Sequence, residues 1–210
     1  MLLDQSRKTE RIIFGGIKLT NQEKLDLFSI ELNYIKTPKI REWVEIALTI
    51  VPDYFFSIPA SSTGKYHPQY ALGEGGLVRH TQAAVGIAQE LFRVEMFGFN
   101  EIEQDCITAA LILHDTYKSG INHERFTVTE HPIVAVEQFN KHTELTNLLT
   151  PEQYKIIFDC IAHHMGQWTT DYRSKREVLE KPKTKIAKIA HLCDYIASRK
   201  CLEFVRGNAG

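Results

Sequence analysis

The stretch Ala109-Ala110-Leu111-Ile112-Leu113-His114-Asp115 decides the fold of this 210-residue chain. Its apolar run predicts a helix that passes through the interior and ends on a histidine followed by an aspartate. Burying an imidazole or a carboxylate without a partner costs on the order of several kcal/mol. We therefore expect other parts of the chain to bring a metal, a cation or hydrogen-bonding groups to this pair.

Composition and charge are those of an ordinary globular protein. Hydrophobic residues make up 43% of the chain and charged residues 24%, which is typical of a domain with a packed core. Lys and Arg total 25 against 26 Asp and Glu, so the net charge is −1. This balance disfavours a long polyanion wrapped over a basic face. The length suits one domain, or one domain with an appendage.

The cysteines and the N-terminus indicate a reducing compartment. No C-x-x-C spacing occurs among the four cysteines, Cys106, Cys160, Cys193 and Cys201. The first three lie in apolar helical stretches, so we expect small buried hydrophobes. The start of the chain lacks an apolar segment of signal-peptide length, and the longest apolar run, 107–113, is too short to span a bilayer. We expect a cytoplasmic protein with no membrane partner.

Helical periodicity dominates the rest of the chain and predicts an all-α fold. The expected helices cover residues 21–35, 39–51, 77–97, 101–115 and 131–140, a segment that starts at 150–152 and ends at Gly166, and a long segment after Pro182. Asn21, Asn100 and Thr150 are the expected N-caps. Residues 11–14 fit either a short strand or an extended arm.

A long irregular stretch, residues 52–76, leads into His80 and is rich in proline and glycine. Such a stretch inside a compact domain is usually a functional or a flexible loop. Within it, residues 61–67 combine small hydroxyls, a glycine and a cation, which makes Lys65 and His67 candidate phosphate contacts. The stretch lacks the spacing of a P-loop, so an ordinary solvated loop stays the alternative.

Polar residues follow the inward-facing stripes of several expected helices. They are His80, His114, Asp115, His131, His163, His164 and Asp194. Such side chains converge only inside a helical bundle, which is how bundles build metal sites. Imidazole with carboxylate suits Mn, Fe, Co, Ni or Zn, and the lack of a suitably placed thiolate favours an open catalytic site.

Two features of the histidines leave alternatives open. The adjacent His163 and His164 point about 100° apart on a helix, so either both flank one metal or one of them faces the substrate. The other histidines lack an inward-facing position, and by default we assign them to the surface or to loops. They are His67, His123, His142 and His191.

The order and flanks of these residues resemble the HD-domain metal-dependent phosphohydrolase superfamily. The resemblance runs from about Gly75 to Ala197 and includes the strings GGLVRHT, LILHDTYK, EHP and IAHHMG. LILHDTYK is similar to the family's HD-x-x-K. The additional His131 and the His163-His164 pair resemble the binuclear branch, which includes cyclic-nucleotide phosphodiesterases, a 3′→5′ exoribonuclease family and the nuclease domain of a CRISPR helicase-nuclease. The G-Y-P signature of the cyclic di-GMP branch is absent after His164.

The resemblance implies a helical bundle with the metal site in its centre. Residues 75–210 would form the core, and residues 1–74 would add N-terminal helices and a loop packed on it, as one compact unit. It also implies two divalent metals. The first would be held by His80, His114, Asp115 and Asp194, and the second by Asp115 as a bridge with His131, His163 and His164.

The implied activity is hydrolysis of a phosphoester by a metal-bridging hydroxide, with Asp115 and Lys118 as catalytic residues. The substrate would be a nucleotide, a cyclic nucleotide or a short single-stranded nucleic acid. Lys118 lies one turn beyond His114 and would also contact phosphate. Arg79, Trp168 and Arg173 complete the candidate substrate contacts; the aromatic side chains after His164 suit base stacking, with peripheral packing as the alternative for at least one of them.

Two other functions remain open at this point. The same ligand order resembles a di-iron oxygenase that cleaves a polyol, for which oxygen consumption would be diagnostic. A metal-stabilised helical module that binds a nucleotide or a partner protein is the non-enzymatic alternative. Tight binding without turnover, unchanged on removing Asp115, would indicate such a module.

Overall fold

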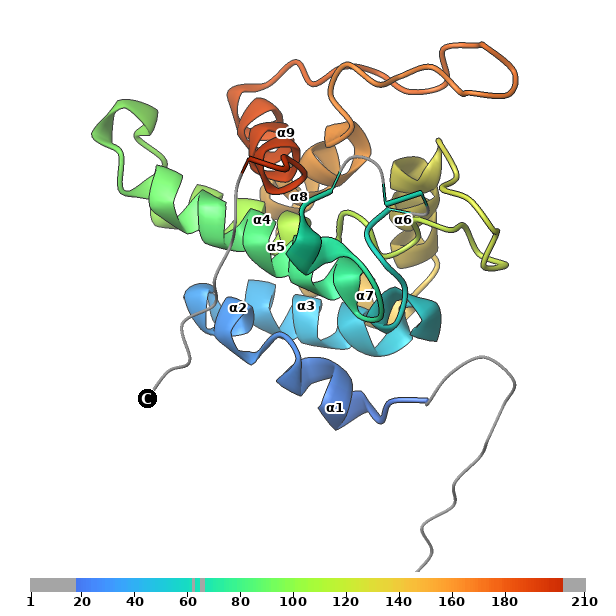
Figure 1. The fold of residues 1–210 in the computed structure, drawn as a ribbon. Helices are drawn as coiled ribbons and strands as arrows, with labels where there is room; N and C mark the ends of the chain where they lie inside the picture. The colour runs from blue at the N-terminus through green and yellow to red at the C-terminus, as the bar shows by residue number, and fades with distance from the viewer. Residues whose placement is uncertain (1–17, 62, 65–66, 202–210) are drawn as a thin grey trace, which may run out of the picture.

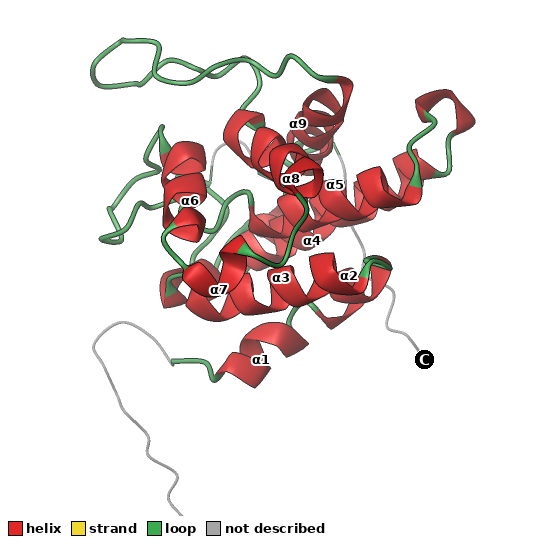
Figure 2. Ribbon diagram, turned by 180° about the vertical axis from the view of Figure 1, so that it is seen from behind, coloured by secondary structure: helices red, strands yellow, loops and turns green. Residues whose placement is uncertain are grey.

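The computed structural model describes residues 18–61, 63–64 and 67–201 (Figures 1 and 2). The helices of this part are α1 (Asn21–Asp26), α2 (Ser29–Tyr34), α3 (Pro38–Ile50), α4 (Gly76–Phe92), α5 (Glu101–Leu113), α6 (His131–Asn140), α7 (Thr143–Thr146), α8 (Pro151–His163) and α9 (Lys185–Ala197), with the 3-10 helices η1 (Asp53–Phe56), η2 (Gln69–Ala71) and η3 (Glu95–Phe97). The β pairing found there is an isolated bridge between Thr170 and Glu177. The predicted all-α fold is confirmed.

Helix α5 forms the centre of the bundle. Every one of its residues from Asp105 to Leu113 is buried, as expected of a helix that is covered on all sides. It packs against α3, α4, α8 and α9. Figure 1 shows α1, α2 and α3 on one side of α4 and α5, with α8 and α9 on the opposite side. The helix therefore delivers His114 and Asp115 to the interior, where each is 1% exposed.

The N-terminal helices are attached to α5 through a buried carboxylate. Asp105 is 2% exposed and accepts hydrogen bonds from the backbone N–H groups of Lys36, at 3.0 and 3.1 Å, and Thr37, at 2.7 Å. These groups precede α3, whose N-terminus has no side-chain cap of its own. The carboxylate thus caps backbone N–H groups at the N-terminus of α3 that have no other side-chain cap. The division of the chain between residues 74 and 75 stays a prediction.

We expect Asp105→Ala to lower the free energy of unfolding by about 2–4 kcal/mol, because the buried Asp105 carboxylate and its three charge-assisted hydrogen bonds to two N–H groups are lost. Urea denaturation followed by circular dichroism measures the loss. Asp105→Asn, which keeps one acceptor oxygen, should lose less. Glu101→Ala, on the exposed first turn of the same helix, is the control. Equal stability of Asp105→Ala and wild type would contradict this role.

Several predicted helix boundaries were wrong. The expected helix 21–35 is broken into α1 and α2 at Phe28, whose φ of −113° and ψ of 16° depart from helical values. The Phe28 ring is fully buried and stacks on Phe55, with ring centroids 6.0 Å apart, so tertiary packing outweighs the local periodicity. The N-cap of α1 is Thr20 with a capping box to Glu23, not Asn21. Asn100 and Thr150 are N-caps as predicted.

Other segments also differ from the expectation. The helix expected over 77–97 ends at Phe92 and is followed by η3, and the four-residue α7 was not predicted. The residues 11–14, left open between strand and arm, lie outside the described residues. No helix in the described part of the chain is both long and apolar enough to cross a membrane. Cys106, Cys160 and Cys193 are buried as predicted, whereas Cys201 is exposed.

The irregular stretch before α4 is fastened to the first turns of that helix. A Cβ on Gly76 would lie 2.3 Å from the carbonyl oxygen of Ala71, so only glycine allows the loop backbone to approach this closely. Arg79 donates from Nε to the carbonyl of Tyr70 at 2.5 Å and from Nη2 to that of Leu72 at 2.8 Å. These contacts hold the loop beside His80.

Candidate metal centre

Six histidine and aspartate side chains from five helices or their ends converge at the centre of the bundle. They are His80 on α4, His114 and Asp115 directly after α5, His131 at the start of α6, His164 directly after α8 and Asp194 on α9. The four histidines and Asp115 are at most 1% exposed, and the Asp194 side chain is 17% exposed. All of them except His131, which begins α6, lie on or directly after an apolar helical stripe, and these stripes direct the side chains toward one interior point.

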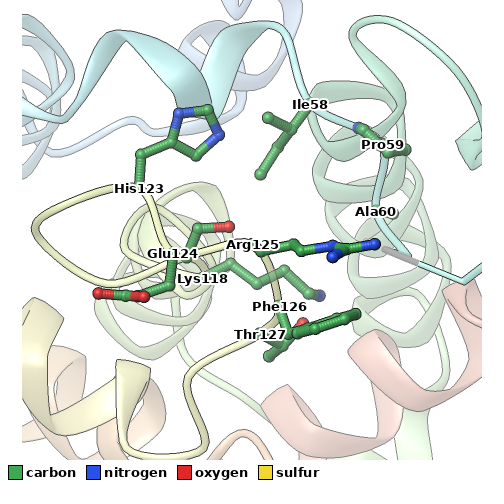
Figure 3. Close-up of a pocket in the computed structure, with 10 residues that line it drawn as sticks. Ile58, Pro59, Ala60, Lys118, His123, Glu124, Arg125, Phe126 and Thr127 are labelled. Atoms are coloured by element: carbon green, nitrogen blue, oxygen red, sulfur yellow. The ribbon is translucent and has the colours of Figure 1, made fainter.

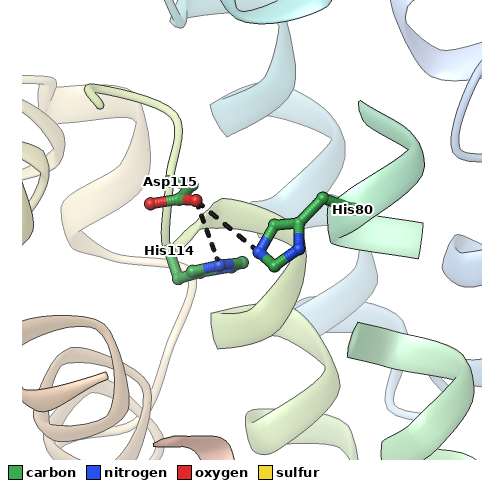
Figure 4. A group of neighbouring side chains, drawn as sticks. All are labelled: His80, His114 and Asp115. Carbon is green, nitrogen blue, oxygen red and sulfur yellow. Dashed lines mark ion pairs between the residues drawn. The ribbon is translucent and has the colours of Figure 1, made fainter. Parts of the chain in front are cut away.

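One part of the cluster lies between α4, α5 and α9. Nε2 of His80 is 2.9 Å from Oδ1 of Asp194 and 3.8 Å from Oδ2 of Asp115. Nε2 of His114 is 3.5 Å from Oδ2 of Asp115 and 3.6 Å from Oδ1 of Asp194. Figure 4 shows His80 and His114 directed at the same carboxylate oxygen of Asp115 from two different helices. Ligand atoms of these three residues all lie within 4.8 Å of one another.

The other part of the cluster uses the second oxygen of Asp115. Its Oδ1 is 3.0 Å from Nε2 of His131 and 3.6 Å from Nε2 of His164. The two histidine Nε2 atoms are themselves 3.1 Å apart. Asp115 therefore lies between two groups of potential metal-ligand atoms, and each of its carboxylate oxygens faces one group.

Backbone carbonyls determine which nitrogen of three rings carries the proton. Nδ1 of His114 lies 2.7 Å from the carbonyl oxygen of Leu111, and Nδ1 of His131 lies 2.7 Å from that of Val128. Nδ1 of His164 lies 2.8 Å from the carbonyl oxygen of Ile161. A carbonyl only accepts hydrogen bonds, so we assign the proton to Nδ1 in each ring. In the neutral rings this leaves Nε2 with a lone pair aimed into the cluster, the arrangement that metal-binding histidines adopt.

The donor set fits a divalent transition metal. Nε2 of His114 and Oδ1 of Asp115 are buried and have no hydrogen-bond partner among the described residues, which is costly unless a cation satisfies them. The facing Nε2 lone pairs of His131 and His164 repel one another unless a cation lies between them. Nitrogen and carboxylate donors without a thiolate match Mn, Fe, Co, Ni or Zn.

The electrostatics of the cluster also require positive charge. Burial by itself raises the pKa of the Asp115 carboxyl, but Lys118 and the neighbouring imidazoles outweigh burial and hold that pKa well below its usual range. Burial lowers the pKa of His164 to about 4, so this ring is neutral and available as a ligand near neutral pH. Burial also lowers the pKa of His114, yet the carboxylates of Asp115 and Asp194 reverse the effect and raise it.

His163 lies apart from these groups. Its Nδ1 is 2.9 Å from both the carbonyl oxygen and Oδ1 of Asp159, one turn earlier on α8. Its side chain is 22% exposed, whereas His164 is 1% exposed. Among the described residues, His164 belongs to two of the donor groups and His163 to none. The two neighbours thus point in different directions, as the helical geometry requires.

Lys118 and His67 border the cluster. Nζ of Lys118 is 2.5 Å from Oδ2 of Asp115, and its side chain is 13% exposed. The ring of His67 lies 5.0 Å from that of His80, edge to face. Its Nδ1 is buried without a hydrogen-bond partner among the described residues, and burial, aided by Lys118 and His80, lowers its pKa to about 3. His67 lies in a loop, as assigned by default, but its ring is turned toward the cluster, which the sequence did not predict.

His191, assigned by default to the surface or a loop, instead lies part-buried on α9. Its Nδ1 is 2.7 Å from the carbonyl of His164, and a Cβ on Gly166 would lie 2.2 Å from its ring. The ring therefore holds the chain turn that follows His164. Its position three residues before Asp194 on α9 was the sequence signal for this placement, since residues i and i+3 share a helix face.

The other candidate contacts are more distant. Trp168 is 44% exposed and stacks on Tyr195, with centroids 5.6 Å apart. Arg173 is exposed, in the loop that joins α8 to α9. Arg79 binds the loop carbonyls described above, and Lys65 lies outside the described residues. The structure thus brings six predicted ligands and Lys118 together, and does not bring Arg173 to them.

A comparison with protein-family models decides the affiliation of this chain. The HD domain model matches residues 65–199, more than half of the sequence. This chain belongs to the HD-domain family. The matched range contains every residue of the buried histidine and aspartate cluster, and the HD domain is the hallmark of metal-dependent phosphohydrolases. Neither the curated proteins nor the solved structures contain a match to the chain.

Proposed function

We propose that this HD domain hydrolyses a phosphoester of a nucleotide, a cyclic nucleotide or a short single strand with the help of two divalent metals. The observation that carries the proposal is the convergence of Nε2 of His131 and Nε2 of His164, 3.1 Å apart, on one oxygen of Asp115, at 3.0 and 3.6 Å. The two histidine nitrogens and the Asp115 oxygen form a buried group of three potential ligand atoms, which a cation would stabilise. The other oxygen of Asp115 belongs to a second such group, which would hold a second cation.

In this proposal Asp115 would contribute one carboxylate oxygen to each of two metal positions. His80, His114 and Asp194 complete the first, with Oδ2 of Asp115. His131 and His164 complete the second, with Oδ1. Bound metals of this kind activate water and neutralise phosphoryl oxygens during in-line attack. We leave His163 out of the ligand set because its ring is already paired with Asp159.

The chain's own residues then bind and orient the substrate. Lys118 pairs directly with Asp115 of the cluster. When substrate binds, its ammonium can move from the Asp115 carboxylate to a phosphate oxygen. His67 covers the edge of His80 and restricts water on that side. Trp168 has one ring face against Tyr195, and its exposure supports a role in stacking on a base. Arg173 would contact phosphate only from its exposed loop.

The test of this function is metal-dependent hydrolysis by the purified full chain. We expect metal analysis to find about two metals per chain after incubation with Mn and removal of excess metal, and bis-p-nitrophenyl phosphate to be hydrolysed. Chelation should abolish the turnover and Mn should restore it. Metal binding with no turnover of this or any nucleotide ester would support the non-catalytic module, and oxygen consumption by an iron-loaded protein would support the oxygenase.

Lys118→Ala is expected to lower kcat by about 100-fold, as when a charge that stabilises the transition state is removed. The metal content should remain that of wild type, because Lys118 is not a ligand. Lys188→Ala, which removes an exposed lysine of α9, is the matched control and should leave kcat unchanged. A fall in metal content, or an unchanged kcat, in Lys118→Ala would contradict the role.

A further inference from the structure

A cavity of about 490 Å³ opens beside the metal centre. One wall is formed by Ile58, Pro59 and Ala60, in the irregular stretch that precedes α4. The opposite wall is formed by residues 118–119 and 123–127, in the segment between α5 and α6. The cavity is larger than a single phosphate group needs, so it has room for a phosphate together with the part of a molecule that carries it.

Lys118 joins this cavity to the metal centre. Its side chain lines the cavity, while its ammonium contacts Oδ2 of Asp115 at 2.5 Å. A phosphoester held at the metal centre would therefore have the remainder of its molecule next to the cavity. The cavity and the metal centre are therefore separated by about the length of one lysine side chain.

The second cation of the cavity is Arg125, and its guanidinium is free. Within the described residues no carboxylate forms an ion pair with it; its recorded contact is with the ring of Phe126, 5.2 Å from the centroid. Figure 3 shows Arg125 and Lys118 extending toward the same end of the cavity, while the carboxylate of Glu124 points to the other side. The lining therefore presents the Arg125 guanidinium, with no ion-pair partner among the described residues, beside the Lys118 ammonium, which is paired with Asp115.

The residues that line the cavity suit a ligand that carries both an anionic group and an apolar or aromatic group. A guanidinium binds phosphate through two parallel hydrogen bonds. Ile58 and Pro59 offer apolar surface, and Phe126, 43% exposed, offers a ring face on which a base can stack. We propose that Arg125 binds a second phosphate of the substrate, adjacent to the one that is hydrolysed. The inference rests on the proposed function and narrows its substrate to nucleotides with two phosphates or the end of a short strand.

The test compares two substrates that differ by one phosphate. Thymidine 5′-(p-nitrophenyl phosphate) carries only the reacting group, and its 3′-phosphorylated form carries the second. We expect wild type to prefer the 3′-phosphorylated form by about 10- to 100-fold in kcat/KM, through KM, as for a charge-assisted bidentate contact. In Arg125→Ala the preference should disappear while the one-phosphate substrate is hydrolysed as before. Arg125→Lys should keep part of the preference, and Arg93→Ala, which removes an exposed arginine near the end of α4, should keep all of it.

A binding measurement separates this inference from the proposed function. Calorimetry with thymidine 3′,5′-bisphosphate and thymidine 5′-monophosphate needs no turnover, so it tests the cavity even if neither ester is hydrolysed. Tighter binding of the bisphosphate to wild type, but not to Arg125→Ala, supports the inference. Equal binding of both ligands, or an equal loss of both in Arg125→Ala, overturns it. A third substrate, with its 3′-phosphate esterified to a second nucleoside, identifies which substrate carries the second phosphate. If wild type still prefers this substrate, the natural substrate is the end of a strand. If the preference is lost, the natural substrate is a mononucleotide with two phosphates.

Discussion

Asp115→Asn is expected to remove bound metal from the protein and to lower kcat by about a thousandfold or more, since the several kcal/mol of charge stabilisation that metals supply would be lost. Asp115 faces a donor group with each of its oxygens, at 3.0 Å from His131 and 3.5 Å from His114. A neutral amide cannot bridge two cations. Both metal positions should therefore fail together. Metal content per chain and hydrolysis of bis-p-nitrophenyl phosphate measure the two effects.

Folding must be separated from metal loss in this experiment. Replacing Asp115 leaves the Lys118 ammonium without its partner inside the protein, so thermal unfolding of both proteins in chelator is compared first. Asp159→Asn is the matched control, because Asp159 also pairs with a histidine but lies outside the donor groups. It should keep its metal and its activity. A folded Asp115→Asn protein with the metal content and rate of wild type would eliminate Asp115 as the bridging ligand.

Apolar periodicity was enough to predict the helices that build the centre. The apolar stripes that carry His80, His114 and Asp194 predicted inward-facing side chains, and the structure buries His80 and His114, while the Asp194 side chain is 17% exposed. The same periodicity could not detect the break at Phe28, where stacking on Phe55 outweighs local helix preference. Helical pattern reports local spacing, whereas such a break depends on a contact with a residue 27 positions away in the sequence.

Residues in loops were the least predictable part of the site. His67 and Arg125 lie outside regular helices, so no period reveals which way their side chains point. Their positions depend on tertiary contacts of the loops, such as the hydrogen bond from Tyr54 in η1 to the carbonyl of Gly120 at 2.6 Å. The sequence drew attention to Lys65 and His67 through their composition, but had no signal for Arg125.

The adjacent histidines after α8 show where a sequence motif leaves a choice that geometry can resolve. Both His163 and His164 fit the family pattern, yet neighbours on a helix point about 100° apart. His164 has its Nδ1 bonded to a backbone carbonyl and its Nε2 in the cluster. His163 is turned toward Asp159. In the proposed function, the second metal position would therefore be completed by His131 together with His164.

His131→Ala and His163→Ala test this choice as a matched pair. His131→Ala should lose one of the two metals and at least about 100-fold in kcat, as expected when a ligand is removed, while the first metal stays bound by His80, His114 and Asp194. His163→Ala should keep both metals and a rate within a few-fold of wild type, because its ring is 22% exposed and already paired. Metal analysis and hydrolysis rates, with melting curves as a check on folding, give the answer.

If His163→Ala lost a metal, the ligand set implied by the family resemblance would hold and the pairing with Asp159 would have to break on metal binding. If both variants kept two metals, the second position would lie elsewhere, and the close approach of the His131 and His164 nitrogens would need a shared proton instead of a metal.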